Sequence, residues 1–223
     1  MAINLQKGQR IDIGLTKISV GLGWKPNEGT GYDFDLDASA FMVDKSNKIP
    51  APNFVVCYGN FDSPDSALHH TGDDPTGGNS EEGDDETIQV DLSKVDSRVN
   101  EILFVVTIHE FEKRKQNFGQ VRSSYVRIVN DINTEEIARY ELEEDFSIET
   151  AIEFGKLYKK DSKWKFQASG IGYKESLDYF TIKHCKGIDD IIKSDGTLIR
   201  KDGQEIKVSH PNYSAEYNKI IGG

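Results

Sequence analysis

Apolar and polar residues alternate over most of this chain in short stretches, with a period close to two. That period is typical of β-strands with one buried face, and the Gly, Pro, Asn and Asp clusters between the stretches are typical of turns. The pattern predicts strands over 10–24, 33–43, 53–59, 86–92, 101–111, 123–130, 137–143 and 163–170.

Three stretches depart from simple alternation. "ILFVVTI" (102–108) is continuously apolar, which predicts a central strand buried on both faces. Residues 147–161 carry an apolar stripe at helical spacing with Ser147 as a candidate N-cap, and a second helix is predicted over 175–185. Many short strands followed by two short helices late in the domain predict an antiparallel β-sandwich over residues 1–185.

Residues 186–223 differ from the rest of the chain in their pattern of apolar and turn residues, and they are predicted to be a C-terminal extension. Two turn signals, "SDG" and "KDG", lie next to "TLIR" and "EIKV", which is typical of a small β-hairpin. The alternative is a tail docked on the sandwich. In either case the extension has too few apolar residues to form a core of its own.

Composition narrows the class of protein. The 223 residues contain no apolar run long enough to span a membrane, and the first residues have no signal-peptide pattern. Cys57 and Cys185 are far apart and form no CxxC pair, which favours a reducing cytoplasm. The net charge of −11 argues against nucleic acid and anionic membranes as direct partners.

The negative charge is concentrated in two segments. Residues 73–86 read "DDPTGGNSEEGDDE" and contain no basic residue, while Asp33, Asp35 and Asp37 alternate with apolar residues in "DFDLD". The rest of the chain is close to neutral. The plainest interpretation is a strand with one solvated face and a disordered acidic loop.

The functional interpretation is a site for a hard divalent cation. Calcium takes six to eight oxygen ligands from carboxylates, amides, backbone carbonyls and water, and the glycines of the loop allow the backbone to wrap an ion. No His or Cys lies inside the loop, which disfavours zinc and copper. The carboxylates exceed the charge of one calcium ion, so more than one ion is expected. An EF-hand is excluded because Ala38 stands where that loop needs Gly.

Several motifs together resemble one known family. They are "VGLGW" (20–24), "DFDLDASAF" (33–41), "HTGD" (70–73), "GDDE" (83–86), "FVVTIHE" (104–110), "FGQV" (118–121), "RIVND" (127–131), "YELEEDFSIETAIEFGKLYK" (140–159) and "WKFQASGIGY" (164–173). In this order they resemble the TerD family of tellurium-resistance and stress proteins, over roughly residues 1–185.

The resemblance implies a calcium-binding β-sandwich without catalytic activity, with a role in resistance to tellurite and other chemical stress and with other stress-response proteins as partners. The predicted metal ligands are Asp33, Asp35, Asp37, Asp73, Asp74, Asn79, Glu82, Asp84, Asp85 and Glu86. The acidic loop here is longer than the family's and lacks its Arg, so Asn79, Glu81 and Glu82 have no clear counterpart. Residues 186–223 have no counterpart in the family either.

Several enzymatic interpretations are alternatives to a non-catalytic binding module. His69, His70 and His109 could suggest a zinc hydrolase, but no HExxH spacing exists. Paired carboxylates could suggest a glycosidase, although such crowding of acids is better explained by cation binding. The remaining alternative is a calcium-dependent enzyme or binder that acts on a phosphorylated small molecule, for which His70 is the nearest candidate base.

Overall fold

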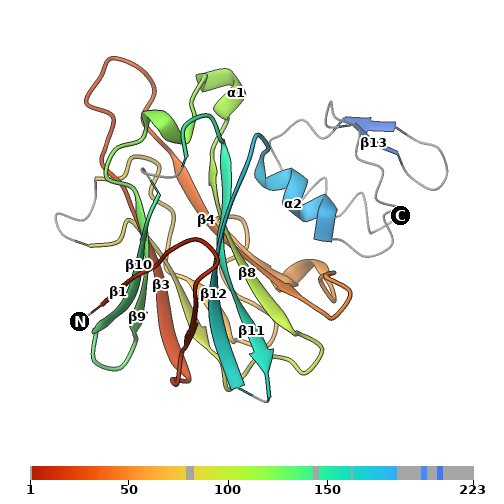
Figure 1. Ribbon diagram of the computed structural model, residues 1–223. Coiled ribbons are helices and arrows are strands. Elements are labelled where there is room, and N and C mark those ends of the chain that lie inside the picture. The colour runs from red at the N-terminus through yellow and green to blue at the C-terminus, as the bar shows by residue number, and fades with distance from the viewer. Residues whose placement is uncertain are drawn as a thin grey trace.

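The computed structural model describes residues 2–78, 83–142, 146–161 and 163–184, together with the backbone of 197–199 and 205–207. Two six-stranded sheets pack face to face (Figure 1). The first sheet has the order β1 (Ile3–Asn4), β10 (Glu136–Glu141), β9 (Tyr125–Asn130), β3 (Lys17–Gly23), β7 (Glu86–Asp91) and β6 (Leu68–His70).

The second sheet has the order β2 (Arg10–Asp12), β12 (Lys163–Tyr173), β11 (Ala151–Lys160), β8 (Glu101–Ile108), β4 (Leu36–Val43) and β5 (Val55–Val56). All pairs in both sheets are antiparallel except β1 with β10. The predicted class, a mainly β protein with two antiparallel sheets and two short helices, is confirmed. Apart from Glu101, every residue of β8 is buried, as its continuous apolar run predicts.

Four short helical segments complete the described domain. They are the 3₁₀ segments η1 (Pro52–Phe54) and η2 (Phe118–Gln120) and the α-helices α1 (Phe111–Arg114) and α2 (Leu177–His184). Helix α2 confirms the helix predicted over 175–185. It packs on the second sheet, where Phe180 is fully buried and its ring lies 6.2 Å from the ring of Phe41.

The helix predicted over 147–161 is wrong, because this segment forms β11 between β8 and β12. A β-bulge explains the misleading pattern. Glu153 pairs with Val105 and Gly155 with Phe104, so Phe154 is an extra residue in the strand. The extra residue breaks the alternation of buried side chains and imitates helical spacing. With strands on both sides, β11 is buried on both faces at its start.

In the extension, β13 (Thr197–Ile199) pairs antiparallel with β14 (Glu205–Lys207), in agreement with the predicted hairpin. All other residues of 185–223, Cys185 included, lie outside the described residues, so the boundary at 185 stays a prediction. Within the described part of the chain, no helix is long and apolar enough to cross a membrane.

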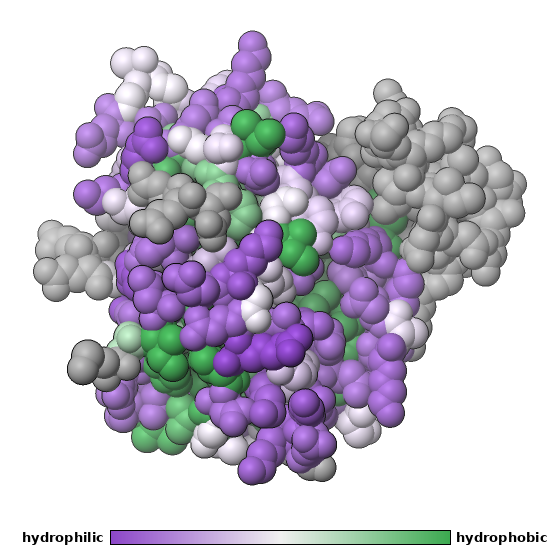
Figure 2. All heavy atoms as spheres, in the orientation of Figure 1, coloured by the Kyte–Doolittle hydropathy of each residue, from purple (hydrophilic) through white to green (hydrophobic). Residues whose placement is uncertain are grey.

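The surface in Figure 2 is mainly hydrophilic, with small hydrophobic areas between the polar side chains. Among the described residues, the large apolar side chains that remain exposed come from separate strands and turns, and they are Ile3, Tyr32, Phe61, Ile132, Ile148 and Ile171. The core lies between the two sheets.

Candidate metal centre

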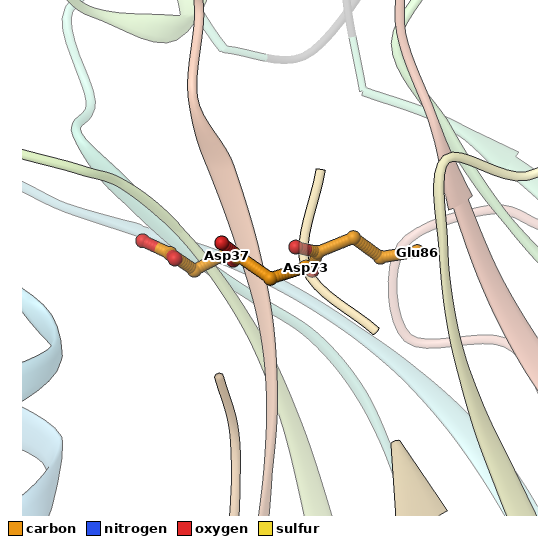
Figure 3. Close-up of side chains that lie close together, drawn as sticks. All are labelled: Asp37, Asp73 and Glu86. Atoms are coloured by element: carbon orange, nitrogen blue, oxygen red, sulfur yellow. The ribbon is translucent and has the colours of Figure 1, made fainter. Parts of the chain in front are cut away.

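Three of the predicted ligands come together at one place. Asp37 from β4, Asp73 from the loop after β6 and Glu86 at the start of β7 each offer a carboxylate oxygen, and these atoms lie within 4.8 Å of one another (Figure 3). We call these three residues the carboxylate triad. Asp37 and Glu86 are 4% and 1% exposed, whereas Asp73 is exposed. The triad therefore has a buried side and a side that faces solvent.

Asp37 lies on a strand that is buried on both faces. β4 lies between β8 and β5, and all eight of its residues are buried. The polar side of the alternation is therefore buried, which contradicts the interpretation of a solvated face. Glu86 reaches the same place from the other sheet, where its Oε2 accepts a hydrogen bond of 2.6 Å from the backbone N–H of Ala38. Its Oε1 accepts one of 3.3 Å from the N–H of Asp74.

Burial makes the negative charge of the triad unfavourable. Loss of solvent, followed by repulsion from Glu86 and Asp35, raises the pKa of Asp37 well above its usual value. Loss of solvent likewise raises the pKa of Glu86 to about 9, and the hydrogen bond from Ala38 offsets only part of that effect. Without a compensating positive charge, burial favours the protonated form of both carboxyl groups, and Glu86, with a pKa of about 9, holds its proton near neutral pH. A bound cation would favour their ionised forms.

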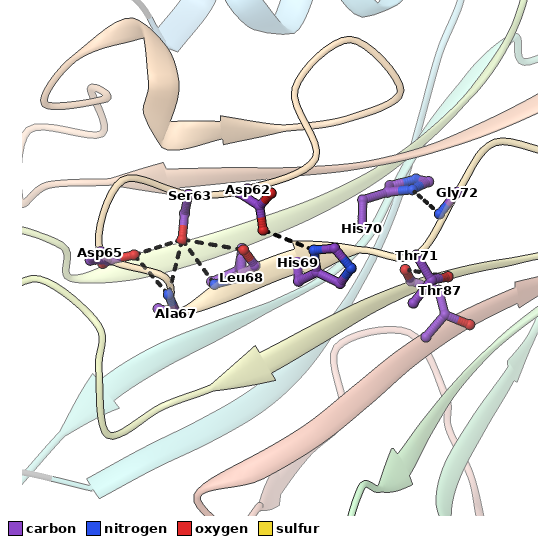
Figure 4. Close-up of polar contacts among 10 residues, drawn as sticks. All are labelled: Asp62, Ser63, Asp65, Ala67, Leu68, His69, His70, Thr71, Gly72 and Thr87. Atoms are coloured by element: carbon purple, nitrogen blue, oxygen red, sulfur yellow. Dashed lines mark hydrogen bonds and ion pairs between the residues drawn. The ribbon is translucent and has the colours of Figure 1, made fainter.

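His70 lies beside the carboxyl group of Glu86. Its Nε2 is 3.4 Å from Oε2 of Glu86, both side chains are fully buried, and its ring stacks on Phe61. Its Nδ1 accepts a hydrogen bond from the N–H of Gly72, which places the ring proton of the neutral imidazole on Nε2 (Figure 4). Burial lowers the pKa of His70, which favours that neutral form. The neighbouring His69 is half-exposed and instead contacts Asp62.

The other two aspartates of "DFDLD" have different surroundings. Asp35 forms an ion pair with Arg114, in which Nη2 of Arg114 lies 3.1 Å from Oδ2 of Asp35. Burial raises the pKa of Asp35, and His109 and Arg114 oppose that rise. Asp33 is exposed, and its carbonyl oxygen accepts a hydrogen bond from Gln116 Nε2. Only Asp37 of the three belongs to the triad.

The remaining loop acids hold the loop in shape. Asp74 is buried, and its Oδ1 accepts hydrogen bonds from both the N–H and the hydroxyl group of Thr76. Asp84 accepts a hydrogen bond of 2.7 Å from Arg127 Nε, and Asp85 Oδ2 accepts one from the N–H of Trp24. The predicted ligands Asn79 and Glu82, and also Glu81, lie outside the described residues.

Arg114, Arg127 and His70 contribute to this region in ways that the sequence did not reveal. Arg114 lies far along the chain from Asp35, and nothing in its local pattern indicates the pairing. Arg127 was visible only as part of the motif "RIVND". His70 was visible in the sequence as a candidate base, and its local pattern did not indicate its contacts with Gly72 and Glu86.

The donor set suits a hard cation. All three groups of the triad are carboxylates, so the site offers oxygen and no thiolate. Three carboxylates supply part of the six to eight oxygens that calcium takes, and backbone carbonyls and water supply the rest in many such sites.

Comparison with known proteins agrees with this architecture. The TerD domain model matches residues 1–184. The chain is 48% identical over 183 residues to general stress protein 16U of Bacillus subtilis, an alignment that covers 79% of this chain and 94% of that protein. It is 43% identical over 182 residues to the tellurium resistance protein TerD of Serratia marcescens, with the same two coverages.

Among solved structures, a homologue of the telluride resistance protein TerD from Streptomyces coelicolor superposes with a TM-score of 0.63 at 21% identity. That match covers 75% of this chain and 96% of the other, and it supports the same fold. The family model and the curated relatives both extend over the whole described sandwich. The chain therefore belongs to the TerD family.

Proposed function

We propose that this protein is a calcium-binding module of the cytoplasmic stress response, without catalytic activity. The names of its relatives support the stress-response part, since they include a general stress protein, tellurium resistance proteins and a chemical-damaging agent resistance protein. The proposed partners are other stress-response proteins, and the proposed role is resistance to tellurite and related chemical damage.

The observation that carries calcium binding is the carboxylate triad. Two of its members are buried beside each other with strongly raised pKa values, which is an unfavourable arrangement unless protons or a cation compensate the charge. Asp73 completes the oxygen set on the solvent side, where an ion can enter. Calcium is favoured over magnesium because the donors come from three separate segments, which suits the flexible coordination of calcium better than the strict octahedron that magnesium requires.

A binding role is supported by the state of His70, the nearest candidate base. It is 1% exposed, Nδ1 accepts from Gly72, and Nε2 faces Glu86. Both ring nitrogens therefore face protein groups, and a substrate outside the site would not reach them. The ion in this proposal serves structure and recognition, and it ties the strand that carries Asp37 to the acidic loop.

The test is a calorimetric titration of chelator-stripped protein with calcium and with magnesium. We expect calcium to bind with at least about a tenfold preference over magnesium, and the stoichiometry gives the number of ions. Asp37→Asn should abolish binding at the triad. Asp12→Asn is the matched control, because Asp12 is 76% exposed and pairs with Lys165 at the edge of the sheet. No calcium uptake by the wild-type protein, or an unaffected Asp37→Asn variant, would refute the proposal.

A further inference from the structure

Trp24 contacts each of the three segments that carry the residues of the triad. It directly follows β3 and is 5% exposed. Its indole Nε1 donates a buried hydrogen bond of 2.9 Å to the carbonyl oxygen of Phe34, and its backbone N–H donates one of 2.9 Å to Oδ2 of Asp85. One residue thus contacts the segment that leads into β4 and the residue directly before Glu86.

The third contact of Trp24 is with the acidic loop. Gly77 lies so close to the indole that a Cβ added there would collide with Nε1, and its φ of +67° is a conformation that L side chains rarely adopt. The N–H of Gly77 also donates to Asp74 Oδ1, next to Asp73. The segments of Asp37, Asp73 and Glu86 therefore all contact Trp24 a few residues away from the triad.

We propose that Trp24 is the positioning residue of the metal centre. The inference rests on the calcium-binding function proposed above. Trp24 acts through the backbone of Phe34 and Gly77 and through the side-chain carboxylate of Asp85, the residue directly before Glu86. Its indole N–H is essential to this role, because a side chain of similar shape without that donor leaves the buried Phe34 carbonyl without its hydrogen bond.

The first test compares two tryptophan variants. Trp24→Phe keeps an aromatic ring and removes the N–H donor. Trp164→Phe is the matched control, because Trp164 is the only other tryptophan and lies half-buried on β12 beside Lys159. We expect Trp24→Phe to weaken calcium binding by about 10- to 100-fold in calorimetry, as loss of an outer contact does in other metal sites. Trp164→Phe should leave the affinity within about twofold.

A second measurement does not depend on the folding of the Trp24 variant. In Trp164→Phe the only tryptophan is Trp24, so its fluorescence reports on this position alone. We expect the emission to change during calcium titration with the same midpoint as the calorimetric curve. A constant emission while calcium binds, or equal affinities for Trp24→Phe and Trp164→Phe, would overturn the inference and leave the proposed function intact. A wild-type protein that binds no calcium would overturn both.

Gly77→Ala tests the same contact from the loop side. Its matched control is Gly14→Ala, since Gly14 has a similar φ of +63° but nothing within 4 Å of an added Cβ. The two variants therefore share the backbone strain and differ in the collision with the indole. We expect Gly77→Ala to weaken calcium binding and to alter the fluorescence of Trp24, and Gly14→Ala to do neither. Equal calcium affinities for the two variants would count against the inference.

Discussion

Glu86 on one sheet accepts a 2.6 Å hydrogen bond from the backbone N–H of Ala38 on the other, although 48 positions separate them in the chain. This bond places the carboxyl group of Glu86 close to that of Asp37, and both side chains are buried. A carboxyl group in that position gains a structural bond and loses its contact with water. The loss of water raises the pKa of Glu86 more than the hydrogen bond from Ala38 lowers it, and this determines how stability depends on pH and on bound calcium.

The metal-free protein should lose stability as pH rises. The pKa of Glu86 is about 9 in the folded protein against an ordinary value of 4.5, so the folded state binds more protons than the unfolded state between these values. The stabilising contribution is fully present below about pH 4.5 and is lost as pH approaches 9. Denaturant unfolding of chelator-treated protein at pH 5, 7 and 9 measures this slope, and Glu86→Gln should reduce it. A slope that Glu86→Gln leaves unchanged would contradict this assignment.

Glu86→Gln should also separate folding from metal binding. The amide oxygen of Gln can still accept the hydrogen bond from Ala38, and no charge has to be buried. We expect the metal-free variant to be at least as stable as wild type at pH 8 and to lose calcium binding at the triad. Glu101→Gln, on a half-exposed side chain paired with Lys156, is the control and should retain calcium binding. Calcium binding by Glu86→Gln at wild-type affinity would remove Glu86 from the site.

Arg114 should weaken calcium binding in the wild-type protein. Its guanidinium pairs with Asp35 at 3.1 Å and also lowers the pKa of Asp37, so its positive charge opposes an incoming cation. We expect Arg114→Gln to raise calcium affinity by about three- to tenfold, because one nearby charge in partly buried surroundings contributes roughly 1 kcal/mol. Arg114→Lys retains the charge and should stay near wild type. A weaker affinity in Arg114→Gln would assign Arg114 a supporting role instead.

Asp84 and Asp73 should differ as substitution sites, although both lie in the acidic loop. Asp84 pairs with Arg127 on β9, whereas Asp73 belongs to the triad. We expect Asp73→Asn to lower calcium affinity strongly. Asp84→Asn should keep the stoichiometry and lower the affinity only through a looser loop, an effect that Arg127→Gln should reproduce. Parallel calorimetric titrations of the three variants give the comparison, and loss of one bound ion in Asp84→Asn alone would make Asp84 a ligand.

The sequence was sufficient for most of the long strands, with the exception of β11, and it located the two acidic segments that supply the triad. Periodicity located β4 and β8 because it depends only on neighbouring residues. It could not show that the polar side of β4 is buried, since that depends on segments far along the chain, such as helix α2, which packs on Phe41 on the same side of the strand as Asp37. The ion pair of Arg114 with Asp35 depends on distant chain segments for the same reason. At β11 a single bulge residue was enough to reverse the prediction.

The metal centre should be independent of the C-terminal extension. The triad lies before residue 87, and the TerD domain model ends at residue 184. Helix α2 belongs to the described domain, because the carbonyl oxygen of its last residue, His184, accepts a hydrogen bond from the N–H of Ile49, and Phe180 is fully buried. A chain that ends at His184 should therefore fold and bind calcium with the stoichiometry and affinity of the full-length protein.

The control for that truncation is a chain that ends at Lys174 and lacks α2. Loss of α2 removes Phe180 and exposes the apolar surface that it covers. Burial of a single Phe side chain contributes about 1.5–3 kcal/mol to the free energy of unfolding, so thermal stability should fall sharply. Melting curves and calcium titrations of both truncated proteins make the comparison. If the chain that ends at His184 folds but no longer binds calcium, residues 185–223 contribute to the site and the predicted domain boundary is wrong.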